Sequence, residues 1–237
     1  MVIDAFMWSY ERDAVKIRLA TLANVVGATV AVQADNTFRG EPRKVRKLNL
    51  PGVTDVVVHI PAGLDVWESE KWLRNTVLAE AVKLFGEHEL YMVSDGDEIP
   101  RPDAIIAAAF AGIPMALRTD YRNFYADWRG KGDELEHQPT IGRLDDYIAV
   151  GGAGDARWHA HWQRSEEVGW HLSSLGKDDA ITAKLETFAH TEYDTDEYKA
   201  GLAAARASHK DFLNRFELEY TDDIPLGVPK RLLGGKF

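Results

Sequence analysis

The 237-residue sequence contains no cysteine. This absence excludes disulfide bridges, thiolate-bound zinc, iron–sulfur clusters and thiol nucleophiles, so any metal ion must be held by Asp, Glu or His. Long hydrophobic runs are also missing, because Gly112 and Pro114 interrupt the longest apolar stretch, and the first residues show no basic or apolar leader pattern. We therefore expect no signal peptide and no membrane span, and a cytoplasmic protein of bacterial or phage type.

Positive charge is in short supply. The chain has 28 Lys and Arg against 38 Asp and Glu, a formal net charge of −10. An acidic protein repels polyanions at long range, which argues against general nucleic-acid binding. Positive charge gathers in one short run, which fits either a solvated loop or a contact with nucleic acid. The run consists of Arg39, Arg43, Lys44, Arg46 and Lys47.

Strand and helix patterns alternate through the first half of the chain. Short β-branched runs predict strands at residues 2–6, 28–32, 55–60 and 90–93. Apolar residues at helical spacing predict helices at residues 11–22, 66–85 and 103–110. Successive β-α-β units indicate a mostly parallel sheet covered by helices on both faces, with ligands bound beyond the carboxyl ends of the strands.

The second half of the chain has a weaker pattern. Residues 115–128 are aromatic-rich and alternating, which predicts an antiparallel strand or hairpin. Residues 130–168 are rich in Gly, Asp and Arg and are expected to form loops and hairpins that shape a cleft. Helices are expected at residues 179–188 and 197–216, followed by a proline-marked tail that wraps the surface. The sequence shows no linker, so we expect a single domain.

An acidic turn, Asp95-Gly96-Asp97, follows the predicted strand at residues 90–93. Two carboxylates on alternate residues at a strand end can converge on Mg²⁺ or Mn²⁺, which usually completes its shell with phosphate oxygens and water. Gly96 would let the backbone approach a bound ligand. The same tripeptide also fits a simple Asx turn before the next helix, and the tripeptide alone does not decide between the two.

Six segments in this order resemble glycosyltransferase family 17, the β-1,4-mannosyl-glycoprotein β-1,4-N-acetylglucosaminyltransferase-like family. They are IDAFM at 3–7, TFRG at 37–40, WE at 67–68 with RN at 74–75, SDGDEIPRP at 94–102, GWHLS at 169–173 and FAHTEY at 188–193. The resemblance covers roughly residues 3–200 and departs from the family at Gln33, where a glutamate is expected. It implies a GT-A-like α/β fold, meaning a Rossmann-like mixed sheet with helices on both faces, together with a UDP-sugar donor, Mn²⁺ or Mg²⁺ and inversion at the anomeric carbon.

We therefore expect a metal-dependent inverting glycosyltransferase that moves GlcNAc or glucose from a UDP-sugar to a hydroxyl acceptor, in the first place a glycan. Within the single domain 1–237, residues 1–112 would bind the donor, residues 113–195 the acceptor, and residues 196–237 would form a helical tail. One alternative is transfer to hydroxymethylated DNA bases, suggested by the basic run. Another is a catalytically silent module that binds nucleotide sugars.

Candidate residues for the donor side follow from the chemistry of a diphosphate leaving group, which needs a metal and cationic or amide donors. The expected metal ligands are Asp95, Asp97 and His171, with His190 as the competing candidate for the histidine. Arg74 lies among apolar helix residues and needs an anionic partner, either the diphosphate or the carboxylates of the acidic turn. The expected donor-binding residues are Arg74, Asn75, Asp95, Lys177 and Lys184.

Candidate residues for the acceptor side are less sharply defined. A general base must deprotonate the acceptor hydroxyl, and the nominated acids are Asp120, Asp127 and Glu192. Sugar rings and bases stack on aromatic faces, although aromatic stripes also commonly form the core. The aromatic candidates are Tyr121, Phe124, Tyr125 and Trp128.

Overall fold

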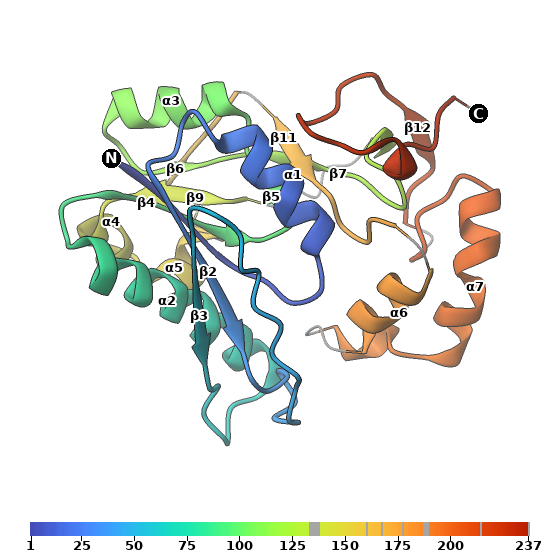
Figure 1. The fold of residues 1–237 in the computed structure, drawn as a ribbon, viewed down its shortest axis with the longest axis horizontal. Coiled ribbons are helices and arrows are strands. Elements are labelled where there is room, and N and C mark those ends of the chain that lie inside the picture. The colour runs from blue at the N-terminus through green and yellow to red at the C-terminus, as the bar shows by residue number, and fades with distance from the viewer. Residues whose placement is uncertain are drawn as a thin grey trace.

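The computed structural model describes residues 1–132, 138–159, 161–166, 168–176, 178–186, 190–213 and 215–236, apart from the side chains of residues 179, 180 and 191. A seven-stranded sheet in the order β10-β6-β9-β4-β1-β2-β3 forms its centre (Figure 1). Four neighbouring strands are parallel: β3 (Val53–Val58), β2 (Ala28–Ala34), β1 (Val2–Met7) and β4 (Leu90–Asp95). The predicted parallel core is therefore present, within a mixed α/β fold of the Rossmann-like class.

The remaining strands are short. In the central sheet, β9 pairs antiparallel with β4 and β6, and β6 pairs parallel with β10. These three strands are β6 (Met115–Ala116), β9 (Thr140–Gly142) and β10 (Gln163–Arg164). Two smaller sheets contain β5 (Glu98–Ile99), β11 (Gly169–His171) and β7 (Thr119–Tyr121), and β12 (Leu218–Tyr220) with β8 (Trp128–Gly130).

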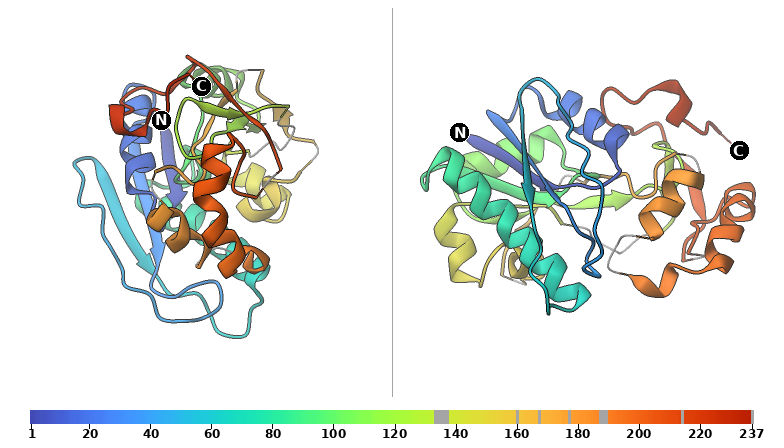
Figure 2. Two further views of the ribbon diagram at one scale, coloured as in Figure 1. Left: turned by 90° about the vertical axis from the view of Figure 1, so that its right-hand side faces the viewer. Right: turned by 60° about the horizontal axis from the view of Figure 1, so that its bottom comes forward.

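Helices cover both faces of the central sheet (Figure 2). One face packs against α1 (Arg12–Leu22) and α3 (Pro102–Ala111), and the other against α2 (Val66–Phe85), α4 (Leu144–Ala149) and α5 (Ala153–Ala156). Helix α2 has the predicted bounds because local signals set both ends. Asp65 and Glu68 form a reciprocal capping box, and Gly86 ends the helix at a φ of 87°.

Helices α6 (Asp178–Leu185) and α7 (Asp196–Ala207) lie at the opposite end of the molecule from α4 (Figure 1). They build a separate apolar cluster with the β8 and β12 region, including Trp128, Leu202 and Leu218. Short 3₁₀ turns occur at Thr191–Tyr193 and Lys230–Leu232. Within the described residues, no helix is both long and apolar enough to span a bilayer.

Predictions for the second half of the chain were partly wrong. Residues 115–128 form no continuous hairpin, because β6, β7 and β8 belong to three different sheets and Phe124 adopts a left-handed φ of 62°. The expected loop region at 130–168 contains β9, which lies between β4 and β6 in the central sheet. The expected helix at 197–216 ends at Ala207, shortly before His209 with a φ of 53°. For the strands, tertiary pairing overrides a weak local pattern, whereas α7 ends in a local cap in which the Lys210 N–H donates to the Ala205 main-chain oxygen at 3.0 Å.

A buried charge joins β1, α1 and the acidic turn. On β1, Ile3, Ala5 and Met7 pack toward α2, whereas Asp4 is buried with Arg18 of α1. The Arg18 Nε lies 2.9 Å from Asp4 Oδ2, and its Nη2 lies 2.8 Å from Ser94 Oγ. Its Nη1 donates to the main-chain oxygens of Asp95, at 3.2 Å, and of Glu98. One guanidinium therefore holds both a strand carboxylate and the backbone of the turn.

We expect Arg18→Met to destabilise the protein by roughly 3–5 kcal/mol, because it leaves the Asp4 carboxylate buried without its cation. Chemical denaturation followed by circular dichroism measures this. Arg231→Met is the matched control, since it removes an exposed ion pair with Asp13 and should cost at most about 1 kcal/mol. Similar free energies of unfolding for the two variants would contradict the structural role given to Arg18.

Candidate functional site

A cavity of about 270 Å³ lies beyond the carboxyl ends of the four parallel strands. Its lining includes Met7 and Trp8 at the end of β1, residues 36–38 after β2, Ile60 after β3 and residues 95–97 at the end of β4. This is the edge at which parallel sheets of this kind bind ligands. The other wall comes from later segments and contains His171, Ser173, Ser174, Lys184, Leu185, His190, Tyr193, Phe212, Leu213 and Arg215.

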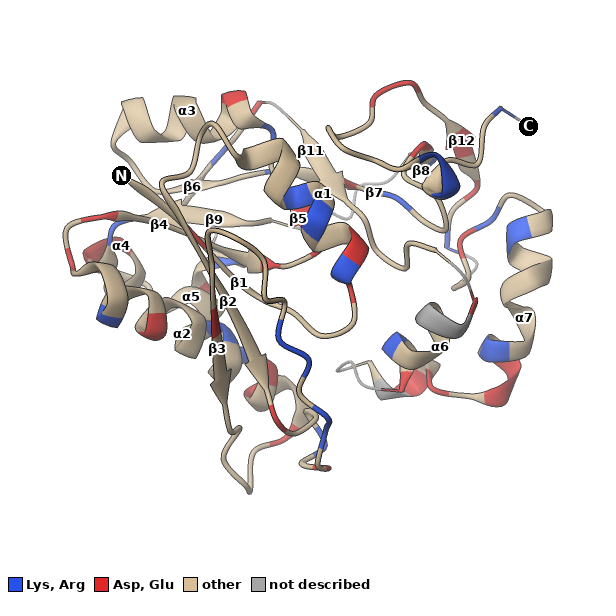
Figure 3. Ribbon diagram, in the orientation of Figure 1, with Lys and Arg blue, Asp and Glu red and all other residues tan. Residues whose placement is uncertain are grey.

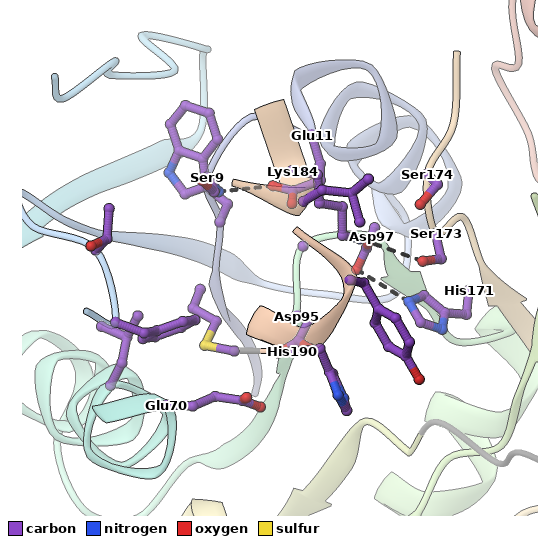
Figure 4. Close-up of a pocket in the computed structure, with 18 of the residues that line it drawn as sticks. Ser9, Glu11, Glu70, Asp95, Asp97, His171, Ser173, Ser174, Lys184 and His190 are labelled. Atoms are coloured by element: carbon purple, nitrogen blue, oxygen red, sulfur yellow. Dashed lines mark hydrogen bonds and ion pairs between the residues drawn. The ribbon is translucent and has the colours of Figure 1, made fainter. Parts of the chain in front are cut away.

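Asp97 lies between two basic side chains on one side of the cavity (Figure 4). Its Oδ2 is 2.7 Å from Lys184 Nζ, and its Oδ1 is 3.6 Å from His171 Nε2. Burial alone would raise the pKa of this carboxyl, but Lys184 and His171 outweigh burial and hold the pKa well below its ordinary value. Asp97 is therefore an ionised carboxylate, and it links β4 to α6.

Asp95 has a different electrostatic environment. Its Oδ1 lies 2.7 Å from Arg74 Nη2, and its Oδ2 lies 3.9 Å from Arg157 Nη2. Burial raises the pKa of Asp95, Arg74 and Arg157 oppose the rise, and the nearby Glu98 adds to it. The structure thus gives Arg74 one of its two expected anionic partners, together with Glu70 at 3.0 Å.

Gly96 has a packing role that differs from the expected one. A Cβ at this position would lie 3.2 Å from Trp8 Cβ and 3.3 Å from the main-chain oxygen of Met7. The Gly96 N–H also donates to that oxygen, at 2.8 Å. The residue is glycine because the turn packs tightly against the end of β1. Gly96 also lines the cavity, and close approach of its backbone to a ligand stays a prediction.

The four expected metal ligands do not form one compact cluster. His171 is near Asp97, whereas His190 lines the cavity with its Nδ1 2.7 Å from Glu192 Oε1 and its ring centroid 4.7 Å from that of Trp67. In the part of the chain that the structure describes, no three His, Asp or Glu side chains are grouped closely enough to hold an ion. A cation at the acidic turn would need ligands from a substrate or water as well.

The expected donor-binding residues fall into three groups. Arg74, Asp95 and Lys184 meet at the acidic turn. Asn75 does not line the cavity, because its Oδ1 accepts a 2.8 Å hydrogen bond from the Gly154 N–H and so joins α2 to α5. Lys177 lies outside the described residues.

Two of the three nominated bases are held in structural contacts. Asp120 binds the Arg122 guanidinium through both oxygens, at 2.8 and 2.9 Å. The Asp127 oxygens accept hydrogen bonds from the N–H groups of Gly234 and Gly235, at 2.8 and 2.9 Å. Neither acid lines the cavity, contrary to expectation. Glu192, in contrast, contacts His190 on the cavity wall.

The aromatic residues expected to stack on an acceptor are placed mainly in packing roles. Phe124 and Trp128 are buried in the cluster beside α6 and α7, with Tyr125 packed against them. Tyr121 lines the cavity, but it is itself buried and its ring meets His171 edge-on at 5.7 Å. The ordinary interpretation of an aromatic stripe as core therefore holds for this segment.

Sequence reasoning missed several cavity residues. Arg157 follows the short helix α5, and its Nη1 lies 2.9 Å from Glu98 Oε2. Glu11 and Glu70 supply two further carboxylates, and Arg215 a further cation. Arg157 and Arg215 lie in segments with no motif, whereas the position of Glu11 just after β1 is a usable signal once ligands are expected beyond strand ends.

The basic run does not form one continuous patch, although Lys and Arg residues do follow the loop between β2 and β3 (Figure 3). Arg39 is paired with Asp194 at 2.9 Å. Arg43 turns into the cavity wall, where its guanidinium lies 2.7 Å from Ser9 Oγ and 2.7 Å from the main-chain oxygen of Ala34. Two cations of the run are therefore engaged in contacts within the protein, and this arrangement does not favour a DNA acceptor.

Comparison with known proteins adds a partial similarity. The chain is 27% identical over 121 residues to β-1,4-mannosyl-glycoprotein 4-β-N-acetylglucosaminyltransferase from Homo sapiens, and equally to that from Rattus norvegicus. The alignments cover 44% of this chain but only 23% and 22% of these curated relatives. No protein-family model matches the sequence. The chain is thus similar to a glycosyltransferase over part of its length, and family 17 stays a prediction.

Among solved structures, 4-diphosphocytidyl-2C-methyl-D-erythritol synthase from Anaerococcus prevotii DSM 20548 aligns with 87% of this chain and 98% of its own. The TM-score is 0.37 and the sequence identity 13%. Likeness at this level carries no argument about function, and the narrower GT-A assignment stays a prediction.

We expect Asp97→Asn to lower the free energy of unfolding at neutral pH by about 3 kcal/mol, because it removes the anion that balances Lys184. Since the folded pKa of Asp97 is depressed, the stabilisation is complete above the unfolded carboxyl pKa of about 3.9 and is lost as the pH falls further toward the folded pKa. Urea titrations of wild type and variant from pH 7 to pH 3 measure the difference. A difference that already fades between about pH 6 and pH 5 would contradict the assignment.

Proposed function

We propose that the protein is a glycosyltransferase that moves a sugar, GlcNAc or glucose, from a UDP-sugar to the hydroxyl group of a glycan acceptor. One observation carries the proposal: the two carboxylates of the acidic turn line a cavity at the carboxyl edge of a parallel sheet, with cationic side chains around them. The partial similarity to N-acetylglucosaminyltransferases supports the same reaction class.

The charge balance of the cavity supports a donor that arrives with a cation. Among the residues that the structure describes, four Lys or Arg and four Asp or Glu side chains line it: Arg43, Arg157, Lys184 and Arg215, and Glu11, Glu70, Asp95 and Asp97. A diphosphate would add negative charge to a site whose own charges already balance. A divalent cation that enters with the diphosphate removes this excess.

The acidic turn has the donor chemistry for Mn²⁺ or Mg²⁺. Asp95 and Asp97 both face the cavity, and Asp97 is ionised in its present environment. These cations are commonly held by one or two carboxylates, with phosphate and water completing the shell. We assign Asp95 and Asp97 as the ligands, with His171 beside them. When bound, such a cation stabilises the charge on the departing diphosphate.

The chain's own residues supply the remaining functions. Lys184, Arg157 and Arg215 present cationic donors to the cavity, where they can stabilise phosphate oxygens. Inverting transfer also needs a base for the acceptor hydroxyl. We assign this role to His190 supported by Glu192: the hydrogen bond from His190 holds the pKa of Glu192 below its ordinary value, so that Glu192 can orient the ring as an anion.

The test is a screen of nucleotide sugars for Mn²⁺-dependent release of UDP and transfer to oligosaccharides, with wild type and Asp97→Ala. We expect the variant to remain folded and to lose at least about a hundredfold in turnover, which corresponds to roughly 3 kcal/mol of barrier. Asp145→Ala, an exposed acid in the first turn of α4, is the matched control and should keep wild-type activity. Wild-type turnover by Asp97→Ala, or full activity in excess EDTA, would sink the proposal of metal-dependent transfer.

A further inference from the structure

Two tryptophans at the cavity are unusually exposed. Trp158 exposes 75% of its surface and Trp67 exposes 52%, and both line the cavity. Leaving an indole in water forgoes roughly 25 cal/mol for each Å² of apolar surface that burial would remove. Exposed apolar surface flanked by charged side chains at a cavity is typical of a ligand-binding groove. These side chains are therefore candidates for contact with a ligand.

The backbone that carries Trp158 is fixed beside the acidic turn. The preceding residue, Arg157, is buried and binds Glu98, with its Nη2 3.9 Å from Asp95 Oδ2. The main-chain N–H of Trp158 donates to the main-chain oxygen of Asp155 at 3.1 Å. The main chain that carries the exposed indole is thus held in place, next in sequence to a guanidinium that contacts the site.

Trp67 is held on the neighbouring helix. Its main-chain N–H donates to the Asp65 side chain at 2.8 Å, within the capping box of α2. Helices α2 and α5 are joined by the Lys71–Asp155 ion pair, at 2.7 Å, and by the contact of Asn75 with Gly154. Trp67 lies on α2 and Trp158 lies two residues after α5, so the two exposed indoles come from two packed segments that both line the cavity.

We propose that Trp158, assisted by Trp67, binds the acceptor by stacking against the apolar face of one of its sugar rings; this inference rests on the proposed function. A sugar ring presents C–H groups on one face and hydroxyls around its edge, so it matches a flat aromatic surface flanked by charged side chains. A glycan acceptor stays partly in solvent when bound, and its binding residues must then lie at the mouth of the cavity. The diphosphate of the donor, in contrast, needs the enclosed charges at the acidic turn.

The test measures binding of mannotriose, chitotriose and maltotriose, and separately of UDP with Mn²⁺, by calorimetry. The proteins are wild type, Trp158→Ala, Trp158→Phe and Phe110→Ala. Phe110 is 88% exposed on α3 and does not line the cavity, so its variant is the matched control. We expect Trp158→Ala to weaken binding of the preferred trisaccharide at least about tenfold, or 1.4 kcal/mol. Trp158→Phe should restore most of this affinity, and Phe110→Ala should match wild type.

Three outcomes would overturn the inference. The first is unchanged trisaccharide binding by Trp158→Ala, and the second is no trisaccharide binding by wild type. The third is a loss confined to UDP, which would place the nucleobase on the indole. If wild type binds a trisaccharide through Trp158 but releases UDP from no nucleotide sugar, the proposed transfer reaction is wrong, whereas sugar binding by the Trp158 side chain is confirmed.

Discussion

The buried guanidinium of Arg18 determines where the acidic turn lies. Its nitrogens are shared between the Asp4 carboxylate on β1, the Ser94 hydroxyl and the main-chain oxygens of Asp95 and Glu98. A buried ion pair is tolerated only when its remaining donors and acceptors are satisfied, and here the backbone of the turn satisfies them. Arg18 consequently links β1, α1 and the acidic turn at the cavity through one set of buried hydrogen bonds.

The two carboxylates of the turn are balanced by cations from different parts of the chain. Asp95 meets Arg74 of α2 and, more distantly, Arg157 after α5, whereas Asp97 meets Lys184 of α6. The first set of contacts belongs to the helices that cover the sheet. The second joins the sheet to the helical region at the other end of the molecule. One wall of the cavity is therefore joined to the other by the Asp97–Lys184 ion pair, between segments that are distant in sequence. A ligand that binds Asp97 would compete with Lys184 for this carboxylate.

How much the sequence predicts depends on how local the signal is. The parallel strands, the bounds of α2 and the acidic turn at the end of β4 follow from β-branched runs, apolar residues at helical spacing and a strand end. β9 could not be found this way, because three residues without periodicity gain their place only by pairing with β4 and β6. Asp127 is nominated as a general base because its segment is expected to border the cleft. A carboxylate in such a segment can equally accept backbone hydrogen bonds, and Asp127 accepts them from Gly234 and Gly235. Likewise, no sequence pattern indicates that the Trp158 side chain is exposed.

Under the proposed function, the acidic turn receives a diphosphate together with a divalent cation. A crystal structure of the protein with UDP-GlcNAc and Mn²⁺, with data collected at the manganese absorption edge, would locate both. We expect an anomalous peak between the diphosphate and the carboxylates of Asp95 and Asp97, inside the cavity beyond the parallel strands. A nucleotide sugar bound at any other surface, or a diphosphate held there with no metal peak at saturating Mn²⁺, would contradict it.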